Sequence, residues 1–66
     1  MPVITLEAGN MSKEQKKNLI EGFTKVASET LDIPAQAFVV IIKQNDGDNI
    51  GTGGRMLSEI HAEQNV

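Results

Sequence analysis

Apolar residues recur along this chain with two different periods, which separate its first strand from its first helix. Residues 3–6 are short, apolar and rich in β-branched side chains, which predicts a strand. Alternation along it places Pro2, Ile4 and Leu6 on one face and Val3 and Thr5 on the other. Proline is tolerated at the start of such a strand because it donates no ladder hydrogen bond there.

After this strand, the apolar residues recur with the period of a helix. Ser12 and Gln15 have capping-box spacing, which predicts a helix that begins near Lys13. Pro34 disfavours helical geometry at Ile33, so the sequence LDIP should end it. Steps of three and four residues predict one inward face made of Leu19, Ile20, Phe23, Val26, Ala27, Thr30 and Leu31.

The segment Phe38–Ile42, FVVII, is apolar without alternation, as expected of a strand buried on both faces. Two strands separated by one helix predict an α/β fold built on a βαβ unit with parallel strands. A single helix covers only one face of so small a sheet. We therefore expect another subunit to cover the other face.

The C-terminal third of the chain is rich in residues that favour turns. The residues NDGDNIGTGG predict a loop or a small hairpin, and the segment 55–61 predicts a short amphipathic helix or a turn with Met56, Leu57 and Ile60 inward. The glycines at 51–54 lack the Lys-Ser/Thr of a phosphate loop, so we interpret them as hairpin geometry.

Length and composition narrow the possible functions. A chain of 66 residues predicts one domain, 1–66, for which assembly is the expected stabiliser because there is no cysteine. Six basic against nine acidic residues and only two aromatic residues argue against a nucleic-acid partner. With no signal-peptide pattern and no apolar run long enough for a membrane span, we expect a soluble cytoplasmic protein.

No metal or cofactor is expected either. Asp46 and Asp48 look like a fragment of a calcium loop, but Leu57 stands where the loop needs a bidentate Glu. The lone histidine, His61, has no serine or cysteine nucleophile to join and is interpreted as a surface residue.

Taken in order, the blocks Met1-Pro2, EQKKNLI, LDIP, VVII and GTGG resemble the 4-oxalocrotonate tautomerase family, over residues 2–60. The resemblance implies a βαβ protomer assembled as a homohexamer, a trimer of dimers, acting as an isomerase on a small molecule. It also implies that Pro2, freed by removal of Met1, is the general base. If Met1 is retained, the Pro2 nitrogen is an amide and cannot take this role.

The chain departs from the family pattern where substrate carboxylates are held. The family has arginines before the first helix and on the second strand, and an aromatic residue in the loop. Met11, Val39 and Ile50 stand there instead. Lys43 and Arg55 are the candidate replacements, so Lys43, Arg55, Ile50 and Val39 are the expected substrate-binding residues. The alternatives are that Lys43 is a strand-end lysine that extends into solvent, and that Arg55 caps a helix or pairs with an acidic neighbour.

The sequence thus predicts an enol-keto tautomerase that acts on a 2-hydroxydienoate or a related 2-oxo acid. The alternative is a non-enzymatic assembly or ligand-binding module that kept the fold and lost the activity. Retention or loss of Met1 distinguishes the two.

Overall fold

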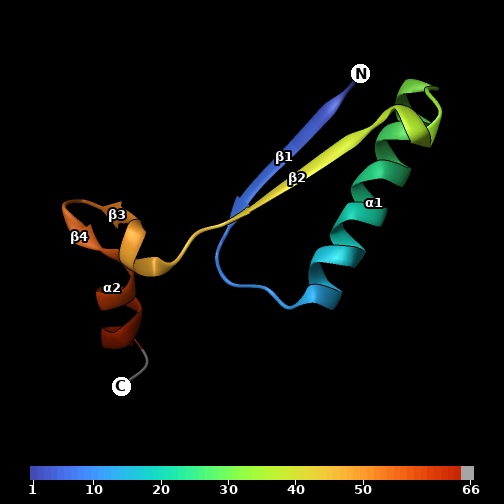
Figure 1. Cartoon of the computed structure of the whole chain (residues 1–66). Coiled ribbons are helices and arrows are strands. Elements are labelled where there is room, and N and C mark those ends of the chain that lie inside the picture. The colour runs from blue at the N-terminus through green and yellow to red at the C-terminus, as the bar shows by residue number, and fades with distance from the viewer. Residues whose placement is uncertain (65–66) are drawn as a thin grey trace.

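The computed structural model describes residues 1–64, and its elements follow the predicted order (Figure 1). They are β1 (Val3–Ala8), α1 (Lys13–Leu31), η1 (Ala35–Ala37), β2 (Val39–Gln44), η2 (Gly47–Asn49), β3 (Gly51–Thr52), β4 (Arg55–Met56) and α2 (Leu57–Gln64). No helix among these residues is long and apolar enough to cross a membrane.

Strands β1 and β2 pair in parallel, as predicted, in a register that places Val3 beside Val39 and Glu7 beside Lys43. Paired residues of parallel strands share a face of the sheet, and β1 alternates strictly between exposed and half-buried positions. One face, which carries Ile4 and Leu6, is half-buried, whereas Val3 on the other face is exposed. The two faces therefore differ as the alternation predicted.

Helix α1 begins where its capping box places it. The Ser12 hydroxyl accepts from the Gln15 backbone N–H at 3.0 Å, and the Gln15 side chain accepts from the Ser12 N–H at 2.9 Å. At the other end Asp32 adopts the left-handed conformation with φ 55°, and its N–H donates to the Ser28 carbonyl. The Ser28 hydroxyl donates to the Ile33 carbonyl at 2.6 Å, which ties the helix end to the crossover.

The inward face of α1 is narrower than predicted. Leu19, Phe23 and Ala27 are half-buried, but the predicted inward residues Ile20, Val26, Thr30 and Leu31 are exposed. Two strands lie only about 4.8 Å apart, so the sheet covers a narrow stripe of the helix. The outer parts of the apolar face remain without a partner in one protomer.

The C-terminal arm, residues 45–64, comprises η2, β3, β4 and α2 and lies away from the βαβ unit (Figure 1). Strands β3 and β4 form an antiparallel hairpin that turns through Gly53 and Gly54 at positive φ, in agreement with the hairpin interpretation. Helix α2 packs on η2 and β4. Leu57 and Ile60 are half-buried, but Met56 is 41% exposed, because it belongs to β4 and not to the helix.

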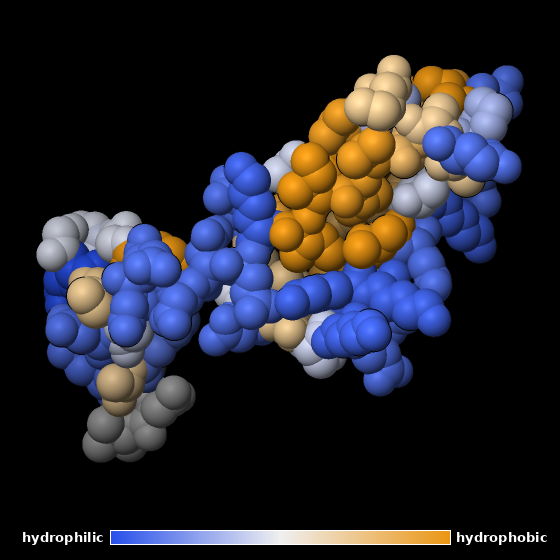
Figure 2. Space-filling model, viewed as in Figure 1, coloured by the Kyte–Doolittle hydropathy of each residue, from blue (hydrophilic) through white to orange (hydrophobic). Residues whose placement is uncertain are grey.

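No described hydrophobic side chain is fully buried. The radius of gyration is 15.6 Å, whereas a compact 66-residue domain would have about 11 Å. The accessible surface of 5096 Å² likewise exceeds the roughly 4,100 Å² expected for a monomer of this mass. Figure 2 shows apolar side chains gathered over β1 and β2, where Val3 is 51% and Ile41 42% exposed. The protomer alone lacks a closed core.

Candidate functional site

Pro2 lies at the start of the sheet, directly before β1, and is half-buried. Its carbonyl accepts a hydrogen bond from the Val39 backbone N–H at 3.0 Å. Met1, by contrast, is 87% exposed and therefore accessible to removal. The hydrogen bond fixes the Pro2 backbone against β2, while the preceding residue projects into solvent.

Val39 is the predicted binding residue that the structure brings to Pro2. Its backbone holds the proline, and its side chain shares the uncovered face of the sheet with Val3. The surroundings of Pro2 on both strands are apolar, since Phe38 precedes Val39. This end of the sheet carries none of the six basic residues of the chain.

Lys43 is not brought to Pro2 within one protomer. It lies four residues beyond Val39 on β2, about 13 Å along the strand at the usual rise per residue. It is exposed and stands beside Glu7 in the parallel register, so an opposite charge is its neighbour on that face. In the protomer, Lys43 therefore lies at the opposite end of the sheet from Pro2.

Ile50 and Arg55 do come together, in an open pocket of the C-terminal arm that is lined by Asp48, Asn49, Ile50, Gly51, Gly54, Arg55 and Met56. The Ile50 carbonyl accepts from the Leu57 N–H at 2.8 Å, which fixes the loop against the start of α2. The Arg55 guanidinium donates to the Glu63 carboxylate at 2.5 Å. One apolar and one cationic candidate thus line the same hollow, on the arm that lies away from the βαβ unit (Figure 1).

The sequence did not identify Glu63 as the acidic partner of Arg55, and it gave no indication of a role for Gln44. Glu63 pairs with Arg55 across eight residues, between a strand and a helix, a spacing with no periodic signal. The Gln44 side chain accepts from the Met11 backbone N–H at 3.1 Å and so ties the loop before α1 to the end of β2. Met11 itself is half-buried at this junction.

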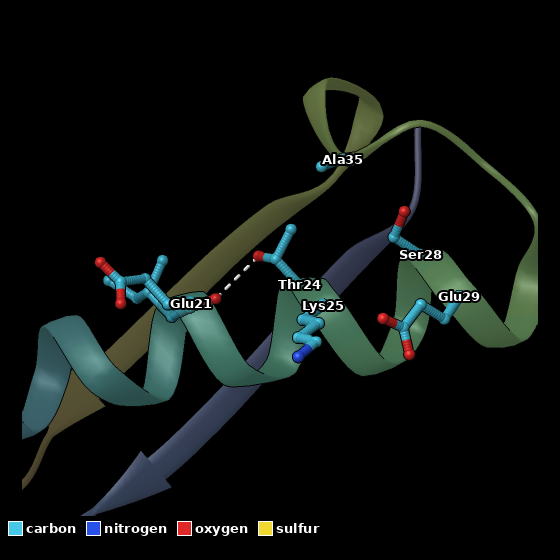
Figure 3. Close-up of a pocket in the computed structure, with 7 residues that line it drawn as sticks. Glu21, Thr24, Lys25, Ser28, Glu29 and Ala35 are labelled. Carbon is cyan, nitrogen blue, oxygen red and sulfur yellow. Dashed lines mark hydrogen bonds between the residues drawn. The ribbon is translucent and has the colours of Figure 1, made fainter.

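A second hollow follows the flank of α1 (Figure 3) and is lined by Ile20, Glu21, Thr24, Lys25, Ser28, Glu29 and Ala35. The Thr24 hydroxyl donates to the Ile20 carbonyl at 2.7 Å, and the Ser28 hydroxyl is bonded to Ile33. Both hydroxyls are occupied by helix and crossover carbonyls, so this groove offers no activated nucleophile. Within residues 1–64 no three His, Cys, Asp or Glu side chains gather in a way that could hold a metal ion.

Comparison with known proteins agrees with this arrangement. Residues 3–60 match a family described as "Tautomerase enzyme". A probable tautomerase of Helicobacter pylori strain J99 is 34% identical over 64 residues, which cover 91% of this chain and 94% of that protein. Probable tautomerase K2 of Dickeya dadantii is 38% identical over 56 residues, 85% of this chain and 84% of that protein.

Solved structures agree as well. TomN, described as a 4-oxalocrotonate tautomerase homologue of the tomaymycin biosynthetic pathway, superposes with a TM-score of 0.86 at 31% identity, over 92% of this chain and 95% of that one. DmpI from Helicobacter pylori gives a TM-score of 0.77 at 31% identity, over 88% of this chain and 98% of its own. The order of elements, the parallel register and these matches together place the chain in the tautomerase family, with the fold of the 4-oxalocrotonate tautomerases.

Proposed function

We propose that this tautomerase moves a proton between the enol oxygen and a carbon atom of a 2-hydroxydienoate or a related 2-oxo acid, with Pro2 as the general base. The observation that carries the proposal is the position of Pro2, held through its carbonyl by Val39 and preceded by an exposed Met1. Removal of Met1 leaves the Pro2 nitrogen as a secondary amine at the chain terminus.

The chemistry of such an amine suits this role. Amino-terminal α-amines ordinarily titrate at about 7.7–8.0, and apolar surroundings disfavour the charged form and lower that pKa. A neutral Pro2 nitrogen takes the proton from the 2-hydroxyl group while the C2–O bond becomes a carbonyl and the double bond shifts. The protonated amine then returns a proton to carbon. The reaction is an isomerisation and requires no further reactant.

The residues proposed to bind the substrate are chosen from the surroundings of Pro2 and from the arm pocket. No basic residue lies at the Pro2 end of the described sheet, and Lys43 stands beside Glu7 at the other end. Val39 and Ile50 are apolar where the family pattern has an arginine and an aromatic residue. We therefore assign Val39 and Ile50 to the apolar part of the substrate, and Arg55 to its carboxylate.

Assembly is part of the same proposal, because these residues do not meet in one protomer. Ile50 and Arg55 lie on the C-terminal arm, and no element of the arm packs extensively on β1 or α1 within residues 1–64. The lack of a closed core and the exposed apolar face of the sheet support association between copies. The family resemblance favours a homohexamer in which the arm of one copy completes the Pro2 site of another.

The test distinguishes an active tautomerase from a protein that has kept the fold and lost the activity. Protein whose intact mass lacks one methionine should tautomerise 2-hydroxydienoates, as followed by ultraviolet absorbance. The same chain with Met1 retained, obtained by blocking its removal, should be inactive because its Pro2 nitrogen is an amide. Equal turnover by both forms would contradict Pro2 as the base, and no turnover by the processed form would favour a binding module.

A further inference from the structure

Arg55 is the only arginine of the chain, and its contact with Glu63 is the only ion pair found within residues 1–64. The contact joins β4 to the last turn of α2 through a single pair of atoms, Nη2 and Oε1, at 2.5 Å. A guanidinium carries five N–H donors in a planar fork that can bind a carboxylate at two points. The single contact with one carboxylate oxygen of Glu63 therefore uses only part of the hydrogen-bonding capacity of Arg55.

The ion pair is not what holds α2 in place. The Leu57 N–H donates to the Ile50 carbonyl at 2.8 Å, and the Ser58 hydroxyl donates to the Asp48 carboxylate at 2.5 Å. These contacts fix the start of α2 on the loop without Arg55. The paired side chains are also exposed, 49% for Arg55 and 63% for Glu63, and exposed pairs of this kind contribute little to stability.

We infer that Glu63 is a specificity-determining residue that competes with the substrate carboxylate for Arg55. The inference rests on the proposed function, in which Arg55 binds the substrate carboxylate from the arm pocket. Glu63 presents the same chemical group and is already bound to the guanidinium of Arg55, which lines that pocket. A substrate carboxylate has to displace Glu63, so Glu63 raises KM for carboxylate substrates and leaves the proton transfer at Pro2 unchanged.

The kinetic test compares Glu63→Gln with Glu59→Gln. Glu59 lies on the same helix, is exposed, and forms no ion pair with Arg55 among the described residues, so its replacement removes the same charge without freeing the guanidinium. We expect Glu63→Gln to lower KM for a 2-hydroxydienoate by about 1.5- to 5-fold, the range that an exposed ion pair is worth, with kcat unchanged. The control should keep the wild-type KM. Adding Arg55→Gln to Glu63→Gln should abolish the gain.

A second readout does not depend on turnover. Because the chain has one arginine, its Nε–Hε group gives a single NMR signal that reports on Arg55 directly. The titrant is muconate, a dicarboxylate without the reactive hydroxyl group. It should shift this signal at a lower muconate concentration in Glu63→Gln than in wild type or Glu59→Gln.

The outcomes separate the inference from the proposed function. If wild type has no tautomerase activity but the NMR titration behaves as described, the proposed function fails and Glu63 still governs anion binding at Arg55. Equal tightening in both Gln variants, or an Arg55 signal that muconate does not move, would overturn the inference. Loss of folding in Glu63→Gln alone would overturn it as well, since the pair would then be structural.

Discussion

Replacing Ile41 with lysine should dissociate the proposed assembly and, with it, the fold. Ile41 lies in the middle of β2 on the uncovered face of the sheet, beside Thr5 in the register, and is 42% exposed in the protomer. That exposed fraction is about 80 Å² of side chain, which contributes roughly 2 kcal/mol per protomer if association covers it. An unpaired ammonium in the same place adds an effective cost of several kcal/mol.

The two effects together correspond to at least a 10³-fold weaker association, since each 1.4 kcal/mol is a factor of ten. Sedimentation velocity at micromolar protein measures the assembly, and far-UV circular dichroism at the same concentrations measures the fold. Because no described hydrophobic residue is fully buried in the protomer, both signals should fall together on dilution.

The matched control is Asn18→Lys, which adds the same charge to an exposed position of α1, on the side of the helix away from Phe23 and the sheet. It should sediment as wild type does. An Ile41→Lys protein with the wild-type sedimentation coefficient would refute the role of the sheet face. A folded wild-type monomer would refute the need for assembly altogether.

Other predictions concern local structure and selectivity. Ser12→Ala removes the acceptor of the α1 capping box and should lower the free energy of unfolding by about 1 kcal/mol in urea titrations, whereas Ser12→Asp should retain it. Gly22→Ala should stabilise by about 0.5–1 kcal/mol, because a Cβ there meets nothing within 4 Å in a helix. Gly47→Ala should not stabilise, because its Cβ would lie 3.2 Å from Ser58. Finally, kcat/KM for 2-hydroxymuconate and for a monocarboxylate analogue should agree within about tenfold. The Lys43→Ala variant should have the same two values, because Lys43 lies beside Glu7 at the far end of the sheet from Pro2. A strong preference for the diacid that is lost in Lys43→Ala would contradict this prediction.

The sequence predicted the βαβ unit well because its signals are local. The capping box at Ser12, the stop at Pro34 and the strand alternation after Pro2 each act within a few residues, and the structure confirms all three. The prediction that Val26 and Leu31 face inward was wrong, because periodicity alone does not give the width of the surface that a helix meets. The hairpin at Gly53 and Gly54 was predictable for the same local reason.

The candidate site was less predictable because its members are joined by contacts distant in sequence. Pro2 was found from its position behind Met1, and Val39 from the family pattern, but their hydrogen bond depends on the parallel register of two strands. The pairing of Arg55 with Glu63 depends on how α2 folds back on β4. No periodicity along the chain encodes such a contact.

Whether Pro2 carries the proton is measured by the turnover of Pro2→Ala on a 2-hydroxydienoate, compared with that of wild type lacking Met1. Both proteins should have the same circular dichroism and sedimentation, because the Pro2 carbonyl that Val39 contacts is kept in the variant. The Pro2→Ala variant should have a kcat lower by roughly 10²- to 10⁴-fold, a loss partly offset because alanine still presents a primary amine. Wild-type turnover in the folded, processed Pro2→Ala protein would contradict it.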